Sequence, residues 1–394
     1  MRKRFLLVLL VVALGLAGPA LAGGLVSGPW PTSSDRPVEP CPHPSLAERA
    51  EELAADLDGG FRLVVFGDQR ALADGEWQAM NQLIRAREDR ERHELPLLGV
   101  IDTGDIVDDG SHTDQFHMLT DILSPLRGWP YVVGIGNHEV DNNRPGPARR
   151  HTVEYLGGMI GDLPDQAEEF ALRENRLYYR VDVGGVRILS LDTNDLVYGP
   201  EGDRADDPGL TYRGRNQLRW LVEQLEDDRG AHTTVVLCHH PFVHSSRKHR
   251  GQARKMWSLR YGGRTLPEIL AVHDVDLVLV GHTHTYERFR LTHRDGGSFQ
   301  VMNISGRPRN SFAWFGADAR RARDIAGVER DYFADAGWTG LDVWSIEQLD
   351  AMIGEEENQW AEVRITPGGV EAEVFFLVDE GAGGVRRGDA FVIE

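Results

Sequence analysis

Several residue types are scarce in this sequence, and each scarcity excludes a class of protein. Only two cysteines occur among 394 residues, which excludes a scaffold held together by disulfides. The 43 basic residues are outnumbered by 62 acidic ones. The resulting net charge of −19 disfavours sequence-independent nucleic-acid binding, which needs many cations against phosphates. A single long apolar run excludes a protein with several membrane spans.

The remaining composition is that of a globular protein, with 41% hydrophobic and 27% charged residues. The chain is long enough for one large domain or two ordinary ones. Cys41 lies in a proline-rich segment and Cys238 in an apolar strand. A bridge between them is possible, but two unpaired cysteines is the simpler interpretation.

The N-terminus predicts export. Arg2, Lys3 and Arg4 precede an apolar stretch at residues 5–16, and small residues follow at positions 20 and 22. This pattern is typical of a signal peptide, here residues 1–22, because the stretch is short for crossing a bilayer. We therefore expect a secreted or periplasmic protein with no membrane association after cleavage. An uncleaved N-terminal anchor that leaves the protein facing outward is the alternative.

The rest of the chain divides into a linker and a folded domain. Residues 23–44 contain six prolines and are predicted to form an extended linker, followed by a domain over 45–394. We expect strands at 61–66, 97–101, 131–135, 233–237 and 277–280, with helices at 76–92, 114–123, 216–227 and 266–273. Hairpins are expected at 178–191 and 361–377. The alternation predicts an α/β fold with mixed strand pairing. Residues 307–358 interrupt this alternation of strands and helices and are interpreted as an insertion or lid.

Five of the predicted strands end in residues that commonly bind metals. The five segments are Gly67-Asp68-Gln69-Arg70, Gly104-Asp105 with Asp108, Gly136-Asn137-His138-Glu139, His239-His240-Pro241 and Gly281-His282-Thr283-His284. Taken alone, the segments have ordinary explanations: turns for the two Gly-Asp segments and Asn137-His138, partly buried histidines for His239-His240, and only a weak metal signal for the last. Together they follow five strands, and ligand sites form where the carboxyl ends of strands converge. Carboxylate, amide and imidazole together suit first-row transition metals better than calcium.

The order of these five motifs resembles that of the calcineurin-like metallophosphoesterase superfamily, over residues 61–291. The segment from Gly281 to Arg288 is similar to the last motif of purple acid phosphatases. The resemblance implies two packed mixed β-sheets flanked by helices, an αββα sandwich. It also implies a pair of divalent or mixed-valence metal ions, with Mn, Zn or Fe expected.

The resemblance implies a role for seven residues. Six are expected metal ligands: Asp68, Asp105, Asn137, His239, His282 and His284. Asp105 would bridge the two metals, with Asn137, His239 and His282 at the second metal and Asp68 and His284 at the first. His138 would face the substrate phosphate without binding metal, and could protonate the leaving oxygen.

The sequence departs from the superfamily in its first motif. Most members have a histidine ligand where this chain has Arg70, which has no lone pair to offer. Purple acid phosphatases compensate with a tyrosine, whose position is Asp108 here. Asp108, Gln69 or water could supply the missing ligand, or Asp108 could serve only as a hydrogen-bonding partner. Arg70 could contact the substrate phosphate as a catalytic residue, pair with Asp108, or weaken the first metal site by repulsion.

These observations favour an exported metal-dependent phosphohydrolase. It would cleave a phosphomonoester or small phosphodiester by metal-activated hydroxide, and its partner would be a small anionic phosphate ester. A degenerate, metal-poor phosphate-ester binding module is an alternative from another class. A phosphodiesterase or nuclease is a third, and the acidic charge disfavours the nuclease. His240, His244 and His249 lie near several basic residues, which could steer an anion or form a solvated loop.

Overall fold

Two β-sheets form the centre of the described part of the chain. A computed structural model describes residues 36–54, 56–71, 75–144, 146–160, 177–198, 212–227, 230–244, 249–306, 343–352, 358–379 and 384–393. The six-stranded sheet has the order β15 (Gly384–Ile393), β14 (Gly369–Asp379), β13 (Gln359–Thr366), β1 (Phe61–Phe66), β2 (Leu97–Asp102) and β3 (Tyr131–Val133). The seven-stranded sheet has the order β12 (Trp344–Met352), β10 (Tyr286–His293), β11 (Ser298–Ile304), β9 (Leu277–Val280), β6 (Thr233–Cys238), β5 (Val186–Ser190) and β4 (Tyr179–Val183).

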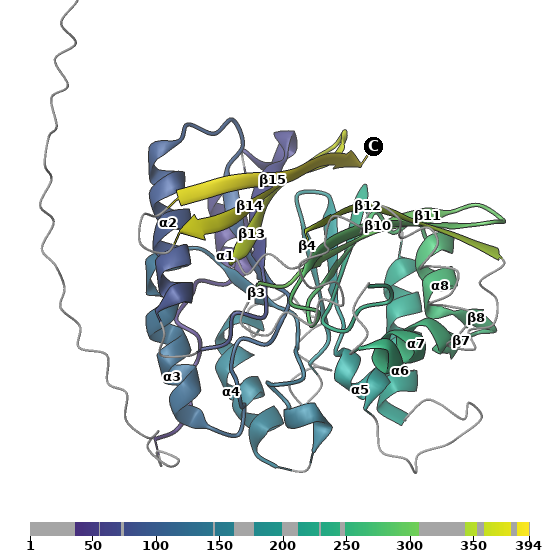
Figure 1. Cartoon of the computed structure of the whole chain (residues 1–394), viewed down its shortest axis with the longest axis horizontal. Helices are drawn as coiled ribbons and strands as arrows, with labels where there is room; N and C mark the ends of the chain where they lie inside the picture. The colour runs from purple at the N-terminus through teal and green to yellow at the C-terminus, as the bar shows by residue number, and fades with distance from the viewer. Residues whose placement is uncertain are drawn as a thin grey trace, which may run out of the picture. The chain divides into compact units, whose positions relative to one another are not determined.

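Both sheets are mixed. Strands β1, β2 and β3 run parallel, as do β5, β6, β9 and β11, and the other pairs within these two sheets are antiparallel (Figure 1). A separate pair, β7 (Arg260–Tyr261) and β8 (Arg264–Thr265), forms a small two-stranded sheet. Parallel neighbours end at the same edge, so each large sheet presents several carboxyl ends side by side.

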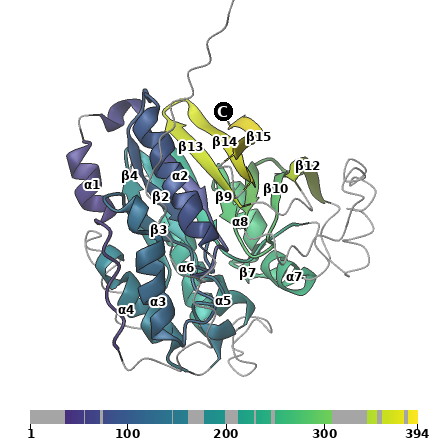
Figure 2. The ribbon, with the colours of Figure 1, turned by 60° about the vertical axis from the view of Figure 1, so that its left-hand side comes forward.

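Helices pack on both sides of the sheets (Figures 1 and 2). On the side of the six-stranded sheet lie α1 (Leu46–Glu52), α2 (Glu76–Arg90), α3 (Thr113–Ile122) and α4 (Ala148–Ile160). On the side of the seven-stranded sheet lie α5 (Thr193–Val197), α6 (Tyr212–Leu225), α7 (Arg250–Ser258) and α8 (Leu266–Val272). Short 3-10 helices are η1 (Leu57–Gly59), η2 (Ser124–Leu126) and η3 (Asp141–Asn143). The α/β fold with two mixed sheets flanked by helices is confirmed.

The continuous apolar strands bury both faces, as strands between two layers must. In β6, Val235 and Leu237 join the core between the two sheets, whereas Val236 and Cys238 pack with the helices on the other side. Every residue of β1 and β2 is buried. This burial holds the strand ends in fixed positions, and the site described below depends on them.

Most predicted elements are confirmed to within a few residues, including the hairpins β4–β5 and β13–β14. The sequence interpretation had the last hairpin end at 377, but a further strand, β15, pairs with β14. Within the expected insertion, Trp344–Met352 form β12, which pairs with β10, and most of the rest of that insertion lies outside the described residues.

The proline-rich segment is described from residue 36. There Cys41 and His43 are buried, the Cys41 amide donates to Tyr155 O, and His43 Nδ1 bonds Trp129 O. The predicted signal peptide lies outside the described residues. Among the residues described, no helix has the length and apolar character needed to cross a bilayer. Cys41 and Cys238 are both buried and free.

Candidate metal centre

The loops after the five strands approach one another closely. A Cβ at Gly281 would lie 2.6 Å from Oδ2 of Asp68, and a Cβ at Gly136 would lie 2.2 Å from Oδ1 of Asp105. Real Cβ atoms do not come so near, so these two positions require glycine. The missing side chains let the loops that carry Gly281 and Gly136 approach the carboxylates of Asp68 and Asp105.

Four of the expected ligands have a left-handed backbone. The φ angles are 57° at Asp68, 57° at Asp105, 72° at His282 and 54° at His284. Residues with a Cβ adopt this conformation at a cost in free energy, and such residues cluster at functional sites. The buried strands that precede these loops hold them in the strained conformation.

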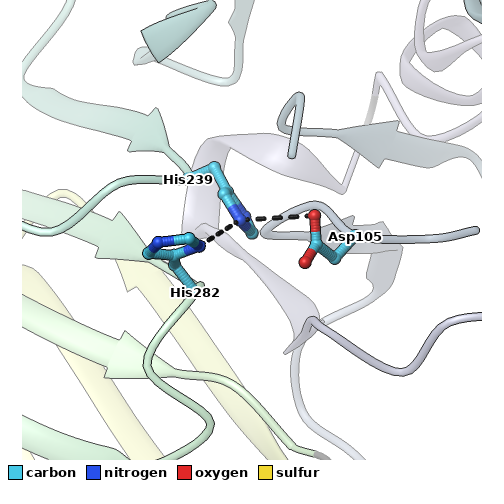
Figure 3. Close-up of side chains that lie close together, drawn as sticks. All are labelled: Asp105, His239 and His282. Carbon is cyan, nitrogen blue, oxygen red and sulfur yellow. Dashed lines mark hydrogen bonds and ion pairs between the residues drawn. The ribbon is translucent and has the colours of Figure 1, made fainter. Parts of the chain in front are cut away.

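One group of potential ligands is formed by Asp105, His239 and His282 (Figure 3). His239 Nε2 lies 3.3 Å from Asp105 Oδ1 and 3.1 Å from His282 Nδ1. Asn137 Oδ1 lies 3.2 Å from the same His239 nitrogen. The His239 Nδ1–H donates to the carbonyl of Thr103, which directs the Nε2 lone pair toward the group.

A second group is formed by Asp68, Asp105 and His284, so Asp105 belongs to both. His284 Nε2 lies 3.5 Å from Asp68 Oδ1, and the other oxygen of Asp68 accepts from the His282 backbone amide. Asp68 Oδ1 is buried and accepts no hydrogen bond from the described residues. An orphaned buried carboxylate oxygen beside an imidazole fits a cation site, because burying it uncompensated is costly.

The electrostatics agree with metal binding by these side chains. Burial by itself would raise the pKa of Asp105, but interactions with the neighbouring His138, His239 and Arg70 side chains lower it below its ordinary value. Burial, with the neighbouring His240 and His249, lowers the pKa of His282 well below its ordinary value. A charged carboxylate and a neutral imidazole are the protonation states that bind metals.

His138 lies at the edge of the centre, with 26% of its side chain exposed. Its Nδ1–H donates to the carbonyl of Asp108, so Nε2 is on the other side of the ring, 3.7 Å from Asp105 Oδ2. The His138 backbone amide donates to Asp105 Oδ1. His138 thus faces the shared carboxylate but belongs to neither ligand group among the described residues.

Arg70 faces the same carboxylate from the first motif. Its Nη2 lies 3.4 Å from Asp105 Oδ2, and its Nη1 donates to Asp108 Oδ1 at 3.1 Å. The Asp108 side chain is 43% exposed and lies in neither ligand group of the described residues. The Gln69 amide nitrogen contacts Met80 Sδ at 3.9 Å. The structure therefore pairs Arg70 with Asp108, as one of the sequence alternatives proposed.

The sequence interpretation gave no role to Glu139, which fixes two of the loops. Its Oε2 accepts from the backbone amides of Asp105 and Gly136, and its Oε1 accepts from that of Val107. The carboxylate is fully buried. Glu139 therefore joins the loop that carries the shared carboxylate to the loop that carries Asn137 and His138.

A sixth strand end was also missed. Asp192, Thr193 and Asn194 follow β5, and the Asn194 amide donates to the carbonyls of Ile135 and Gly136. The signal was present in the sequence, because these polar residues follow an apolar strand as the other motifs do. Their contacts support the Asn137 loop from the side.

The histidines after β6 are buried, so the solvated-loop interpretation is wrong for them. His240, His244 and His249 are 0%, 2% and 6% exposed. The rings of His249 and His240 lie 4.0 and 4.6 Å from that of His282. Positions 245–248, between them, lie outside the described residues.

Comparison with known proteins agrees with this geometry. The family model described as "Calcineurin-like phosphoesterase" matches residues 61–286. Purple acid phosphatase 21 of Arabidopsis thaliana is 31% identical over 179 residues, which cover 45% of this chain and 35% of that protein. The chain therefore spans about a third of the length of the curated relatives it matches.

Two solved structures share the fold. A purple acid phosphatase from yellow lupin (Lupinus luteus) seeds matches with a TM-score of 0.51 and 17% identity, over 84% of this chain and 53% of that one. The structure of PhoD matches with a TM-score of 0.54 and 14% identity, over 85% of this chain and 69% of that one. At these identities the similarity shows the fold alone.

Proposed function

This chain belongs to the calcineurin-like phosphoesterase family, and from that premise we propose that it is an exported, metal-dependent phosphohydrolase. Its substrate would be a phosphomonoester or a small phosphodiester. The observation that carries the proposal is the buried Asp105 carboxylate, shared by two groups of potential metal ligands. The N-terminal signal pattern supports export.

The ligand roles follow from the two groups. Asp68 and His284 would hold one metal, and Asn137, His239 and His282 the other, with Asp105 common to both. Bound at this centre, two Mn, Zn or Fe ions would neutralise phosphoryl oxygens and lower the pKa of a shared water. The carboxylates of Asp68 and Asp105 are buried, so bulk water does not compete with the metals for them.

His138 and Arg70 are the proposed catalytic residues. Because Asp108 accepts the Nδ1–H of His138, the opposite nitrogen is free to face the substrate and to pass a proton to the leaving oxygen. Arg70 would donate to the equatorial phosphoryl oxygens, where negative charge is spread in the transition state. Asp108, held by Arg70, would orient both groups, and the alternative that it supplies a metal-ligating oxygen stays open as a proposal.

One observation favours a second candidate, a metal-poor module that binds phosphate esters. The Arg70 guanidinium already lies 3.4 Å from Oδ2 of Asp105, so part of the charge that a metal would supply is present. In this candidate Arg70 and a single metal would hold the ester without cleaving it. The presence of all six expected ligands in the sequence favours the enzyme, because degeneration of a metal site usually removes several of its ligands.

The test is a reconstitution series. Apo-protein prepared by chelation is given Mn, Zn, Fe, Mg or Ca and assayed with p-nitrophenyl phosphate and bis(p-nitrophenyl) phosphate. The enzyme predicts hydrolysis that returns with about two metals per chain. Ester binding with one metal or none, and no hydrolysis with any metal, would establish the binding module instead.

A further inference from the structure

The turn that follows the third motif has an unusual backbone. Asp141, Asn142 and Asn143 have φ angles of 45°, 52° and 61°, three successive non-glycine residues in the left-handed region. Asparagine and aspartate visit this region more readily than other residues, but normally as single residues. A run of three persists only where surrounding contacts require it.

Within this turn, Asn142 contacts Asn137 through two hydrogen bonds. The Asn142 backbone amide donates to Asn137 O at 2.8 Å, and Asn142 Oδ1 accepts from Asn137 Nδ2 at 3.2 Å. Asn137 is only 7% exposed, and its Oδ1 lies 3.2 Å from Nε2 of His239. Because an amide has one acceptor end and one donor end, holding the nitrogen fixes where the oxygen points.

We propose that Asn142 is a positioning residue that holds the Asn137 amide with its oxygen toward the metal. The assignment rests on the proposed metal centre and adds to it a residue outside the ligand set. Without the Asn142 acceptor, the Asn137 amide is free to rotate and present its NH₂ group to the cation, which repels it. Residues that orient a metal ligand typically affect metal affinity by about 10- to 100-fold.

The two neighbours in the turn have other contacts. Asn143 bonds Asp195 and Arg149, and the Asp141 carboxylate accepts from Arg144 at 3.4 Å with 38% of its side chain exposed. Asp141 therefore offers a matched control, since it shares the left-handed backbone but its side chain points to a different partner.

The experiment compares three variants by titrating Mn²⁺ into chelated protein and measuring the heat of binding. Asn142→Gly keeps the left-handed backbone and the backbone amide that donates to Asn137 O, but it removes the side-chain oxygen that accepts from Asn137 Nδ2. Asn142→Asp keeps a side-chain oxygen that can accept from Asn137 Nδ2. Asp141→Gly changes the same turn but leaves the contact between Asn142 and Asn137 intact. We expect Asn142→Gly to weaken one Mn²⁺ equivalent by about 10- to 100-fold. The other equivalent should be unchanged, and the remaining two variants should bind as tightly as wild type.

Each result bears on the assignment. Wild-type affinity in Asn142→Gly, equal losses in Asn142→Gly and Asn142→Asp, or an equal loss in Asp141→Gly would overturn it. Circular-dichroism melting curves show whether the variants are folded at the titration temperature. Wild-type protein that binds Mn²⁺ but hydrolyses no ester would overturn the proposed function while the Asn142 series still decides this assignment. Wild-type protein that takes up no Mn²⁺ would overturn both.

Discussion

Asp105 connects the two ligand groups through a single carboxylate. Oδ1 faces His239 at 3.3 Å, and Oδ2 faces Arg70 at 3.4 Å. The side chain is fully buried, so its charge requires compensation from neighbouring cations or from metal. A substitution that removes this charge should therefore affect both ligand groups at once.

Asp105→Asn should abolish metal binding and hydrolysis together. A neutral amide cannot balance two adjacent cations, and its NH₂ end would face one of them. Metal content after dialysis and hydrolysis of p-nitrophenyl phosphate are the measurements. The matched control is Asp109→Asn in the same loop, whose carboxylate accepts from Ser111. Near-normal turnover in Asp105→Asn would refute the shared role.

His138→Ala separates catalysis from metal binding. The ring faces the shared carboxylate from outside both ligand groups, so its removal should leave the metal content unchanged. Turnover should fall by about 10²- to 10⁴-fold, the usual contribution of a general acid. Both quantities can be measured on one preparation. Loss of metal in this variant would make His138 a ligand, contrary to its position here.

Arg70 should make the two metals unequal in affinity. Its positive charge lies 3.4 Å from Oδ2 of Asp105 and also interacts with Asp68, so a cation held by Asp68 and His284 would be repelled. In a metal titration the site with Asn137, His239 and His282 should fill first. Arg70→Gln should bring the two affinities closer together. Two equal affinities in the wild-type protein would show that another oxygen fully compensates for Arg70.

Between elements, a buried ion pair connects the two sheets. Arg288 on β10 donates to Asp389 on β15 at 2.7 Å, and the Tyr286 hydroxyl donates to the same carboxylate at 2.7 Å. The Arg288 guanidinium lies 4.1 Å from the centroid of the Phe391 ring. Tyr286 and Arg288 lie two and four residues after His284, so this link also fixes the end of that loop.

Asp389→Asn should destabilise the fold by about 2–3 kcal/mol at pH 7, since it removes the charge partner of a largely buried arginine. Burial alone would raise the pKa of Asp389, but hydrogen bonds from Arg288 and Tyr286 lower it below its ordinary value. The carboxylate therefore stabilises the fold above its unfolded-state pKa, about 3.9. That stabilisation is lost as the pH falls through the lower folded-state pKa.

Denaturant unfolding at a series of pH values measures this effect. The difference between wild type and Asp389→Asn should shrink as the solution becomes more acidic than about pH 4. Glu373→Gln on β14 is the control, because its pair with Arg387 is exposed and should contribute less than about 1 kcal/mol. A pH-independent difference would mean that the Asp389 charge does not contribute.

The strand ends were predictable from sequence, whereas the residues that fix them were not. Asp68 and Asp105 follow recognisable apolar strands, so the local sequence shows both their metal-binding side chains and their position at a strand end. Glu139 accepts from backbone amides, and Asn142 accepts from the side-chain amide of Asn137. Such partners are fixed by the folded backbone and leave no pattern of residue types in the sequence. Strand β15 was missed because it is partly exposed and carries charged residues among apolar ones.

In the molecule as a whole, the candidate metal centre is formed by residues from both sheets. Asp68, Asp105 and Asn137 follow strands of the six-stranded sheet, and His239, His282 and His284 follow strands of the seven-stranded sheet. Metals bound there would connect both halves of the fold. A ligand that binds only the native state stabilises it by about 2.7 kcal/mol at 100 times its dissociation constant.

Chelation should therefore lower the melting temperature of the whole domain in one transition, and added Mn²⁺ should restore it. Differential scanning calorimetry with and without chelator measures the shift. Asp105→Asn supplies the control, because it should melt at the same temperature in both conditions. A wild-type melting temperature that is insensitive to chelator would contradict a centre that joins the sheets.

If Asp105 holds two metals between the two sheets, anomalous diffraction from crystals soaked in Mn²⁺ will locate both ions without reference to activity. We expect two peaks about 3.5–4 Å apart. One should lie against Asp105 with Asp68 and His284, the other against Asp105 with Asn137, His239 and His282. A single peak, or none within coordination distance of Asp105, would contradict it.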